Sequence, residues 1–292
     1  MNKSTKGLLS ILFVMIVWGS ASSVTKVAVN EIPPFTLAFL RFFTALITLL
    51  LMRPFSRSVN DTPMPWVPVT LMGLSGVTAF YIFFNLSLFY TSASIGSLIQ
   101  GFIPVCIAIF AVIFLKERLS GLQITGILLS LIGIIIIGLL ANQGSGAQST
   151  LKGNLFMILA SLAWAIYTVI SHKVTSVDPL KVTIGIAFTG VLFLVPFALF
   201  ECWRSGVPSI SLKGWLAVIY LGSIGSALCY LLYNKAMETM SAAQIGNFLN
   251  LDPLVGLIVA LVFLGEHINM LQVIGGLLVI TGIFLSTWKG RS

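Results

Sequence analysis

The sequence predicts an all-α membrane protein whose ten transmembrane helices form two inverted five-helix repeats. Hydrophobic residues make up 58% of the 292-residue chain, charged residues only 8%, and the mean hydropathy is +1.06. The apolar stretches approach or reach the roughly 20 residues that cross a hydrocarbon core as a helix. They take up nearly all of the chain, so no soluble catalytic or binding domain is expected.

The second half of the chain repeats the first at a nearly constant spacing. Pairs 146 positions apart are Lys6 and Lys152, Gly7 and Gly153, Trp18 and Trp164, and Pro33 and Pro179. Pairs 149 apart are Gly73 and Gly222, Gly76 and Gly225, Tyr81 and Tyr230, Asn85 and Asn234, Pro104 and Pro253, Glu117 and Glu266, Gln123 and Gln272, Gly126 and Gly275, and Gly133 and Gly282. The predicted repeats are residues 1–146 and 147–292.

Each element of the first repeat is an apolar stretch bounded by residues that interrupt helices. The expected spans are 7–29, 35–52, 67–90, 95–115 and 121–140. Pro33-Pro34 separates the first two spans, and prolines 54, 63 and 65 precede the third. The uncharged, Gly/Ser/Gln-rich stretch 142–151 reads as a flexible joint between the halves.

The second repeat follows the same order, with expected spans 153–172, 181–201, 212–234, 241–264 and 269–288. Asp178-Pro179 and Pro208 mark two of its loops. Since five spans is an odd number, the second repeat enters the bilayer from the opposite side. Inverted repeats are a signature of secondary transporters, which hold their substrate near the midplane.

Basic residues set the expected orientation. With the N-terminus in the cytoplasm, eleven Lys and Arg residues fall inside, four fall outside, and Arg41 lies within the second span. Cytoplasmic loops carry such an excess of positive charge, so both termini are predicted to face the cytoplasm of a cell's inner membrane. The inside residues are Lys3, Lys6, Arg53, Arg57, Lys116, Arg118, Lys173, Lys181, Lys235, Lys289 and Arg291.

Several classes of function are disfavoured. The net charge of +8 comes from basic residues at helix ends, so nucleic acid is not an expected partner. No GxxxxGK[ST] phosphate loop occurs, which makes ATP hydrolysis improbable. His172 and His267 fall on opposite sides of the membrane and cannot share a metal ion. No metal, cofactor, disulfide or catalytic set is predicted, and the chain is not expected to be an enzyme.

Three stretches carry a family pattern. The first begins at Trp18-Gly19-Ser20, continues through Lys26 and Pro33-Pro34, and ends at Arg41. The second runs from Pro104 to Lys116-Glu117-Arg118, and the third from Asp252-Pro253 to Gly265-Glu266. Together they resemble the EamA type of drug/metabolite transporter. The resemblance implies an inner-membrane carrier, commonly an exporter of amino acids or other small metabolites. It also implies a cavity built from helices one, three, four, six, eight and nine. His172 departs from the repeat, since it stands where the counterpart of Lys26 would lie.

Asp252 is the acidic residue expected near the bilayer centre. An ionised carboxylate there costs ~2.5–3.5 kcal/mol on insertion scales, so such residues are usually functional. Asp252 could bind a proton, pair with a substrate's amino group, or pack as a structural carboxyl beside Pro253. Helical spacing puts it on the face of Leu249, so the sequence leaves open whether it reaches the cavity.

Other candidates are polar or aromatic residues within the spans. Trp18 and Trp164 lie too deep for an interfacial belt, and both Tyr81 with Asn85 and Tyr230 with Asn234 share a helix face. Aromatic packing and hydrogen bonds between helices are the alternative roles. The predicted cavity residues are Trp18, Ser22, Tyr81, Asn85, Gln100, Trp164, Tyr167, Tyr230, Asn247 and Asn250. The repeated glycines are expected to serve close helix packing.

Two further sets concern movement. Pro104 and Pro253 are predicted hinges, because each leaves free the backbone carbonyl four residues earlier. We expect alternating gates, one at each end of the bundle. Arg41 needs an anionic partner, of which Glu31 is the nearest in sequence, and its expected role is structural. The gate candidates are Lys26 with Glu266 at the outer end, and Glu117 with His172 or Lys173 at the inner end.

The sequence therefore favours a secondary transporter that exports small amino-acid-like or weakly polar metabolites by alternating access. Proton antiport and facilitated diffusion both stay open, as does a channel, while a polytopic enzyme and a membrane scaffold are disfavoured. The expected partners are a small metabolite, the lipid bilayer and, for antiport, protons. The oligomeric state is not readable.

Overall fold

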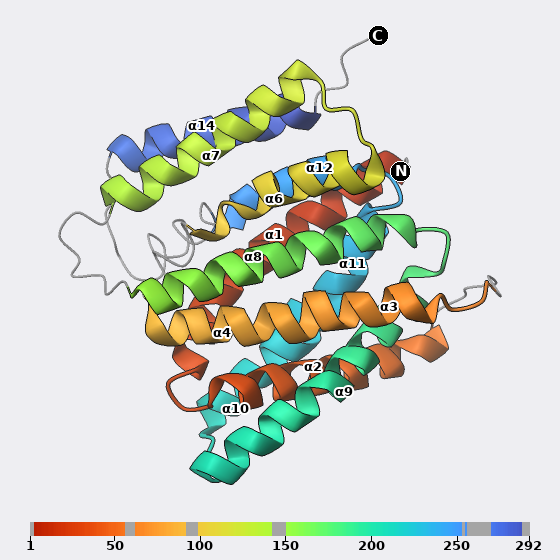
Figure 1. The fold of residues 1–292 in the computed structure, drawn as a ribbon, viewed down its shortest axis with the longest axis vertical. Helices are drawn as coiled ribbons and strands as arrows, with labels where there is room; N and C mark the ends of the chain where they lie inside the picture. Colours follow the sequence, from red (N-terminus) through yellow and green to blue (C-terminus); the bar gives the residue numbers. More distant parts are fainter. Residues whose placement is uncertain are drawn as a thin grey trace.

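Helix occupies part or all of each of the ten predicted spans (Figure 1). The structure is a computed structural model that describes residues 3–55, 62–91, 99–141, 150–252, 255 and 270–287. Strands are absent from these residues, which confirms the predicted all-α class. The ninth span is described only as far as Asp252 and at residue 255.

Apart from the start of the fourth span, which was predicted at residue 95 and where α6 begins only at Ile103, the helices of the first half begin and end close to the predicted limits. They are α1 (Lys3–Ala28), α2 (Pro34–Met52) with the 3-10 turn Arg53–Phe55, α3 (Trp66–Met72), the π-helical segment Gly73–Ala79, α4 (Phe80–Tyr90), α6 (Ile103–Phe110), the π-helical segment Ala111–Leu115, and α7 (Gly121–Ala141). A left-handed Lys116, with φ of 56°, ends the fourth span.

The second half repeats this order, including a π-helical segment in its third span. Its elements are α8 (Leu151–Lys173), α9 (Pro179–Ser205), α10 (Leu212–Ile219), the π-helical segment Tyr220–Leu228, α11 (Cys229–Ala236), α12 (Ala242–Phe248), the 3-10 turn Leu249–Leu251 and α14 (Met270–Thr287).

Length and composition identify membrane-spanning helices directly. Within the described residues, six helices are long and apolar enough to cross a membrane: Thr5–Ala28, Pro34–Met52, Trp66–Tyr90, Leu151–Lys173, Pro179–Ser205 and Leu212–Ala236. Shorter apolar helices are Ile103–Leu115, Gly121–Gly133 and Val273–Leu285. Many of their large apolar side chains are exposed, such as Leu51 and Leu199, as expected where lipid is the solvent. The chain is therefore a multi-pass membrane protein.

Side chains cap several helices at the predicted loops. The Asp178 carboxylate accepts a hydrogen bond from the Leu180 amide at 2.7 Å, and Pro179 opens α9. Ser241 and Gln244 form a reciprocal capping box at the start of α12. The start of α2 is capped by a residue that is distant in sequence. Glu201 on α9 accepts hydrogen bonds from the amides of Phe35 and Thr36 and from the Thr36 hydroxyl.

Neighbouring helices come in pairs that take one member from each half. The packed pairs are α1 with α11, α2 with α9, α4 with α8, α6 with α12, and α7 with α14. Figure 1 shows α7 and α14 side by side at one edge of the bundle. The third span of each half packs on the first span of the other, while spans two, four and five pack on their own counterparts. The centre of the bundle is thus formed by both halves.

Small residues allow the closest helix contacts, and this confirms the predicted packing role of the glycines. A Cβ atom at Gly76 would clash with the Tyr167 ring. At Gly222 it would lie 2.6 Å from the Thr44 Cβ and 2.7 Å from the Arg41 carbonyl oxygen. Close approach through small side chains is how helices associate without a hydrophobic driving force between them.

Candidate functional site

A cavity lies between the two halves, and it is the candidate site. A largely apolar pocket with a few polar groups is the usual place for a small ligand to bind. Its lining comes from α1, α2, α4, α6, α8 and the turn before Asp252, together with Gln100. The lining residues are Trp18, Ala21, Thr25, Arg41, Phe80, Tyr81, Phe84, Gln100, Ile103, Trp164, Leu249 and Asp252.

The lining spans differ in one respect from those that the resemblance implied. The expected set includes the eighth span, whereas the cavity is lined by spans one, two, three, four, six and nine. The second span enters because the Arg41 side chain reaches the cavity from α2. The eighth span lies behind the lining, where its Gly225 carbonyl accepts a hydrogen bond from the Trp18 indole N–H at 2.8 Å.

Two tryptophans form the aromatic wall. The Trp18 and Trp164 rings lie 5.1 Å apart and nearly perpendicular, at 86°. Phe80 packs on Trp164 with ring centroids 4.9 Å apart. Tyr167 and Tyr230 form a second layer against Trp164, at 4.9 and 5.5 Å. The Trp18–Trp164 and Trp164–Tyr230 contacts are edge-to-face, an arrangement that aromatic pairs favour, so these rings support one another in the wall.

The π-helical segments of the third and eighth spans, Gly73–Ala79 and Tyr220–Leu228, place backbone carbonyls at matching positions. The Gly225 oxygen accepts hydrogen bonds from Trp18 Nε1 and, at 3.3 Å, from Arg41 Nη2. The oxygen of its counterpart Gly76 accepts a hydrogen bond from the Tyr230 hydroxyl. π-helical turns inside α-helices frequently occur at functional sites. Here each one ties the aromatic layers of one half to the third span of the other.

Arg41 was expected to be structural, with Glu31 as its nearest anionic partner, but it lines the cavity. It is only 3% exposed, its Nε donates a hydrogen bond to Ser226 Oγ at 2.7 Å, and its guanidinium carbon lies 4.4 Å from the centre of the Tyr81 ring. The expected partner Glu31 lies elsewhere, where its carboxylate accepts a hydrogen bond from the Ser211 amide at 3.2 Å. No carboxylate of the described residues forms an ion pair with Arg41.

Asp252 does reach the cavity. It lies at the end of the 3-10 turn Leu249–Leu251, and its Oδ1 is buried without a hydrogen-bond partner among the described residues. Thr25 on α1 lines the same cavity, is 1% exposed, and its hydroxyl likewise lacks a partner in the described structure. Buried polar groups without partners are rare, and each is a candidate ligand contact.

The predicted amides serve mainly as bridges between helices. Asn85 Nδ2 donates a hydrogen bond to the Pro34 carbonyl at 2.9 Å. Asn234 Oδ1 accepts hydrogen bonds from the hydroxyls of Tyr167 and Ser171, at 2.9 and 2.7 Å. Asn247 Nδ2 donates to the Gly282 carbonyl of α14 at 3.3 Å, and within the ninth span Asn250 Nδ2 donates to Asn247 Oδ1 at 2.9 Å.

The predicted cavity residues therefore divide into two groups. Trp18, Tyr81, Gln100 and Trp164 line the cavity. The others lie outside its lining or outside the description: Asn85, Tyr167, Tyr230, Asn247 and Asn250 lie behind it, and nothing is described of the Ser22 side chain.

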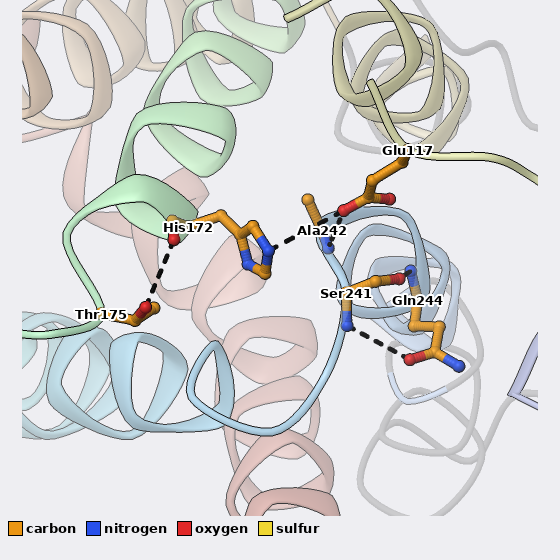
Figure 2. Close-up of polar contacts among 6 residues, drawn as sticks. All are labelled: Glu117, His172, Thr175, Ser241, Ala242 and Gln244. Atoms are coloured by element: carbon orange, nitrogen blue, oxygen red, sulfur yellow. Dashed lines mark hydrogen bonds and ion pairs between the residues drawn. The ribbon is translucent and has the colours of Figure 1, made fainter. Parts of the chain in front are cut away.

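The predicted inner gate brings two of its candidates together (Figure 2). His172 Nε2 at the end of α8 lies 4.0 Å from Glu117 Oε1, and the same oxygen accepts a hydrogen bond from the Ala242 amide at 3.2 Å. Because carboxylates are favoured at helix N-termini, Glu117 is held at the start of the ninth span. Lys173 is exposed and takes no part in this contact.

At the other end, Lys26 Nζ donates hydrogen bonds to the carbonyls of Leu88 and Thr91, at 2.6 and 3.3 Å. It thereby caps the C-terminal end of α4. Its expected partner Glu266 and the expected hinge Pro253 lie outside the described residues.

The first hinge candidate differs from its expected setting. The sequence predicts Pro104 within a continuous helix, but Pro104 lies in the first turn of α6, because Gly101 and Phe102 form a turn just before it. Proline is favoured there, since its missing N–H would have no helical acceptor anyway. The ninth span is irregular at the matching place, the 3-10 turn Leu249–Leu251.

Some lining residues were missed, although signals for them exist. Ala21 and Thr25 follow Trp18 at helical spacings of three and seven, which put them on the same face of α1. Phe80 directly precedes the predicted cavity residue Tyr81, and Phe84 follows Tyr81 at the helical spacing of three.

Comparison with known proteins decides the family. A family model described as the EamA-like transporter family matches residues 5–139 and 151–288. The chain belongs to this family. A crystal structure at 20% sequence identity has the same fold, with a TM-score of 0.81 over 97% of this chain and 96% of that one.

Relatives of this EamA-like transporter cover almost its whole length. An "Uncharacterized transporter" of Archaeoglobus fulgidus is 28% identical over 99% of both chains. A "Probable amino-acid metabolite efflux pump" of Salmonella typhimurium is 26% identical over 98% of this chain and 95% of its own. A "Probable terminal-alkyne amino-acid exporter" of Streptantibioticus cattleyicolor is also 26% identical, over 97% and 94%. The relatives thus carry the names of transporters and exporters.

Proposed function

We propose that this EamA-like transporter is a secondary carrier that exports small amino-acid-like metabolites across the cytoplasmic membrane by alternating access. The observation that carries the proposal is the position of the cavity. It lies between the halves of a duplicated bundle, with both halves contributing its lining. Secondary transporters hold their substrates in this place. The names of the relatives from Salmonella and Streptantibioticus support an amino-acid-like substrate.

Alternating access then requires contacts between the halves to break at one end while they form at the other. The Glu117–His172 contact joins the first half to α8 and, through Ala242, to α12. Under the proposed orientation, with both termini in the cytoplasm, it lies at the cytoplasmic end. Partly exposed pairs contribute only about 0–1 kcal/mol. Such a contact can hold a closed state but does not drive the transition.

The energy source in this proposal is a proton gradient acting through Asp252. A proton that moves through 100 mV gains ~2.3 kcal/mol, which biases accumulation by about fiftyfold. Because a proton and an amino group would occupy the same buried carboxylate, each would displace the other. The buried Oδ1, for which the described part of the chain provides no hydrogen-bond partner, supports this role.

The test is counterflow in proteoliposomes that contain the purified protein. Labelled amino acids and amines are offered on one side, and unlabelled ones on the other, with and without a pH gradient. Saturable exchange supports a carrier, whereas flux without saturation or exchange indicates a channel. Exchange that ignores the pH gradient indicates a facilitated-diffusion uniporter. Absence of flux for the whole panel contradicts the proposal.

A further inference from the structure

The cavity lining contains one basic and one acidic side chain that do not form an ion pair with each other. Arg41 reaches it from α2 and Asp252 from the turn before the ninth span. Within the described residues neither has an ion-pair partner.

Arg41 keeps donors available for a ligand. Its hydrogen bonds to Ser226 Oγ and the Gly225 carbonyl use two N–H groups, and a guanidinium has five. These two bonds and the Tyr81 ring fix the guanidinium plane. A fixed fork of N–H donors matches a carboxylate, which accepts two parallel hydrogen bonds.

The opposite group is an acceptor. Among the described residues, Asp252 Oδ1 is buried without a hydrogen-bond partner, and a buried carboxylate without a counterion is costly. The Thr25 hydroxyl, which also lacks a partner in the part of the chain that the structure describes, lies in the same lining and can donate or accept a hydrogen bond. In the same lining, the aromatic wall of Trp18, Trp164 and Phe80 offers an apolar surface.

We infer that the cavity binds the zwitterionic head group of an apolar α-amino acid, with its carboxylate on Arg41, its ammonium on Asp252 and its side chain against the aromatic wall. This inference deepens the proposed function, on which it rests for its biological meaning. A zwitterion neutralises both buried charges at once. An amine leaves Arg41 uncompensated, and a carboxylic acid leaves Asp252 uncompensated.

The test measures binding to the purified protein in lipid nanodiscs, by calorimetry, with matched sets of ligands. One set is phenylalanine, phenethylamine and 3-phenylpropionate, and the other is leucine, isoamylamine and 4-methylpentanoate. Sites built to pair a polar group reject analogues that lack it, so we expect each truncated analogue to bind at least about 100-fold more weakly than its amino acid.

Two substitutions assign the ends of the site. In Arg41→Gln the advantage of phenylalanine over phenethylamine should fall to nearly onefold, while its advantage over 3-phenylpropionate persists. In Asp252→Asn the pattern should reverse. The matched control is Thr48→Ala. The hydrogen bond between Thr48 Oγ1 and Ser223 Oγ joins α2 to the π-helical segment Tyr220–Leu228, as the Arg41 hydrogen bonds do. It should leave both ratios unchanged.

The wild-type ligand panel decides the matter even if Arg41→Gln does not fold. Equal affinity for an amino acid and either of its analogues overturns the inference, as does failure to bind both amino acids. A uniform weakening of all three ligands by Arg41→Gln assigns Arg41 a structural role and also overturns it. Selective binding without counterflow would contradict the transporter proposal alone. Equal counterflow of phenethylamine and phenylalanine would keep the carrier and reject the zwitterion site.

Discussion

Glu117 and His172 lie 4.0 Å apart at one end of the bundle and connect its two halves. Each belongs to a loop or helix end rather than to a helix centre, and Glu117 Oε1 also accepts a hydrogen bond from the Ala242 amide. A single carboxylate thus contacts the sixth span and the start of the ninth. Its removal should loosen both contacts at once.

Glu117→Gln should therefore open the proposed cytoplasmic end more often. Ala21 lines the cavity, so Ala21→Cys in a background without Cys106, Cys202 and Cys229 reports access. We expect a membrane-impermeant maleimide to label it up to about fivefold faster in inside-out vesicles, since the pair contributes about 0–1 kcal/mol. Lys173→Gln, which removes an exposed neighbouring charge, is the control. An unchanged labelling rate in Glu117→Gln would contradict the gate.

Gly76→Ala should destabilise the bundle through overpacking. The added Cβ would clash with the buried Tyr167 ring, and forced repacking typically costs about 1–3 kcal/mol. Fluorescence-monitored thermal unfolding in detergent should give a lower midpoint. Gly121→Ala is the matched control, because no atom lies within 4 Å of its added Cβ, and its change should stay within about 0.5 kcal/mol. Equal midpoints for the two variants would refute the packing argument.

Glu201→Ala should weaken the start of α2. The lost carboxylate leaves the amides of Phe35 and Thr36 without their acceptor, and loss of such a cap costs about 0.5–2 kcal/mol. The same thermal unfolding measures the loss. Glu238→Ala removes an exposed carboxylate instead and should have little effect. A midpoint for Glu201→Ala as high as that of Glu238→Ala would exclude the capping role.

The fold could be predicted because its signals are local or repeated. Span length and composition identify the helices, and the matching pairs place Trp18 and Trp164 at equivalent depths, where both line the cavity. Loop positions follow from prolines and caps such as Asp178, which act on neighbouring residues.

The site could be predicted only in part, because a side chain's role depends on partners that are distant in sequence. Asn85 and Gln100 are equivalent as isolated amides, yet one bridges to Pro34 and the other faces the cavity. Arg41 looked structural because Glu31 is the nearest carboxylate along the chain, but Glu31 contacts Ser211, 180 positions away. The periodicity of a sequence predicts which side chains share a helix face, but not which distant residues pack against that face.

Asp252→Asn should separate transport from its driving force. An amide of the same shape keeps the packing but can no longer exchange a proton, and Asp252 is the described carboxylate that lines the cavity. We expect gradient-driven accumulation of amino acid in proteoliposomes to fall from as much as about fiftyfold for a 100 mV equivalent to near onefold. Counterflow without a gradient should persist, though with lower affinity. Glu238→Gln, an exposed carboxylate, is the control and should accumulate normally. Full accumulation by Asp252→Asn would show that the carboxylate does not couple transport to protons, because the substituted amide has no proton to release at any working pH.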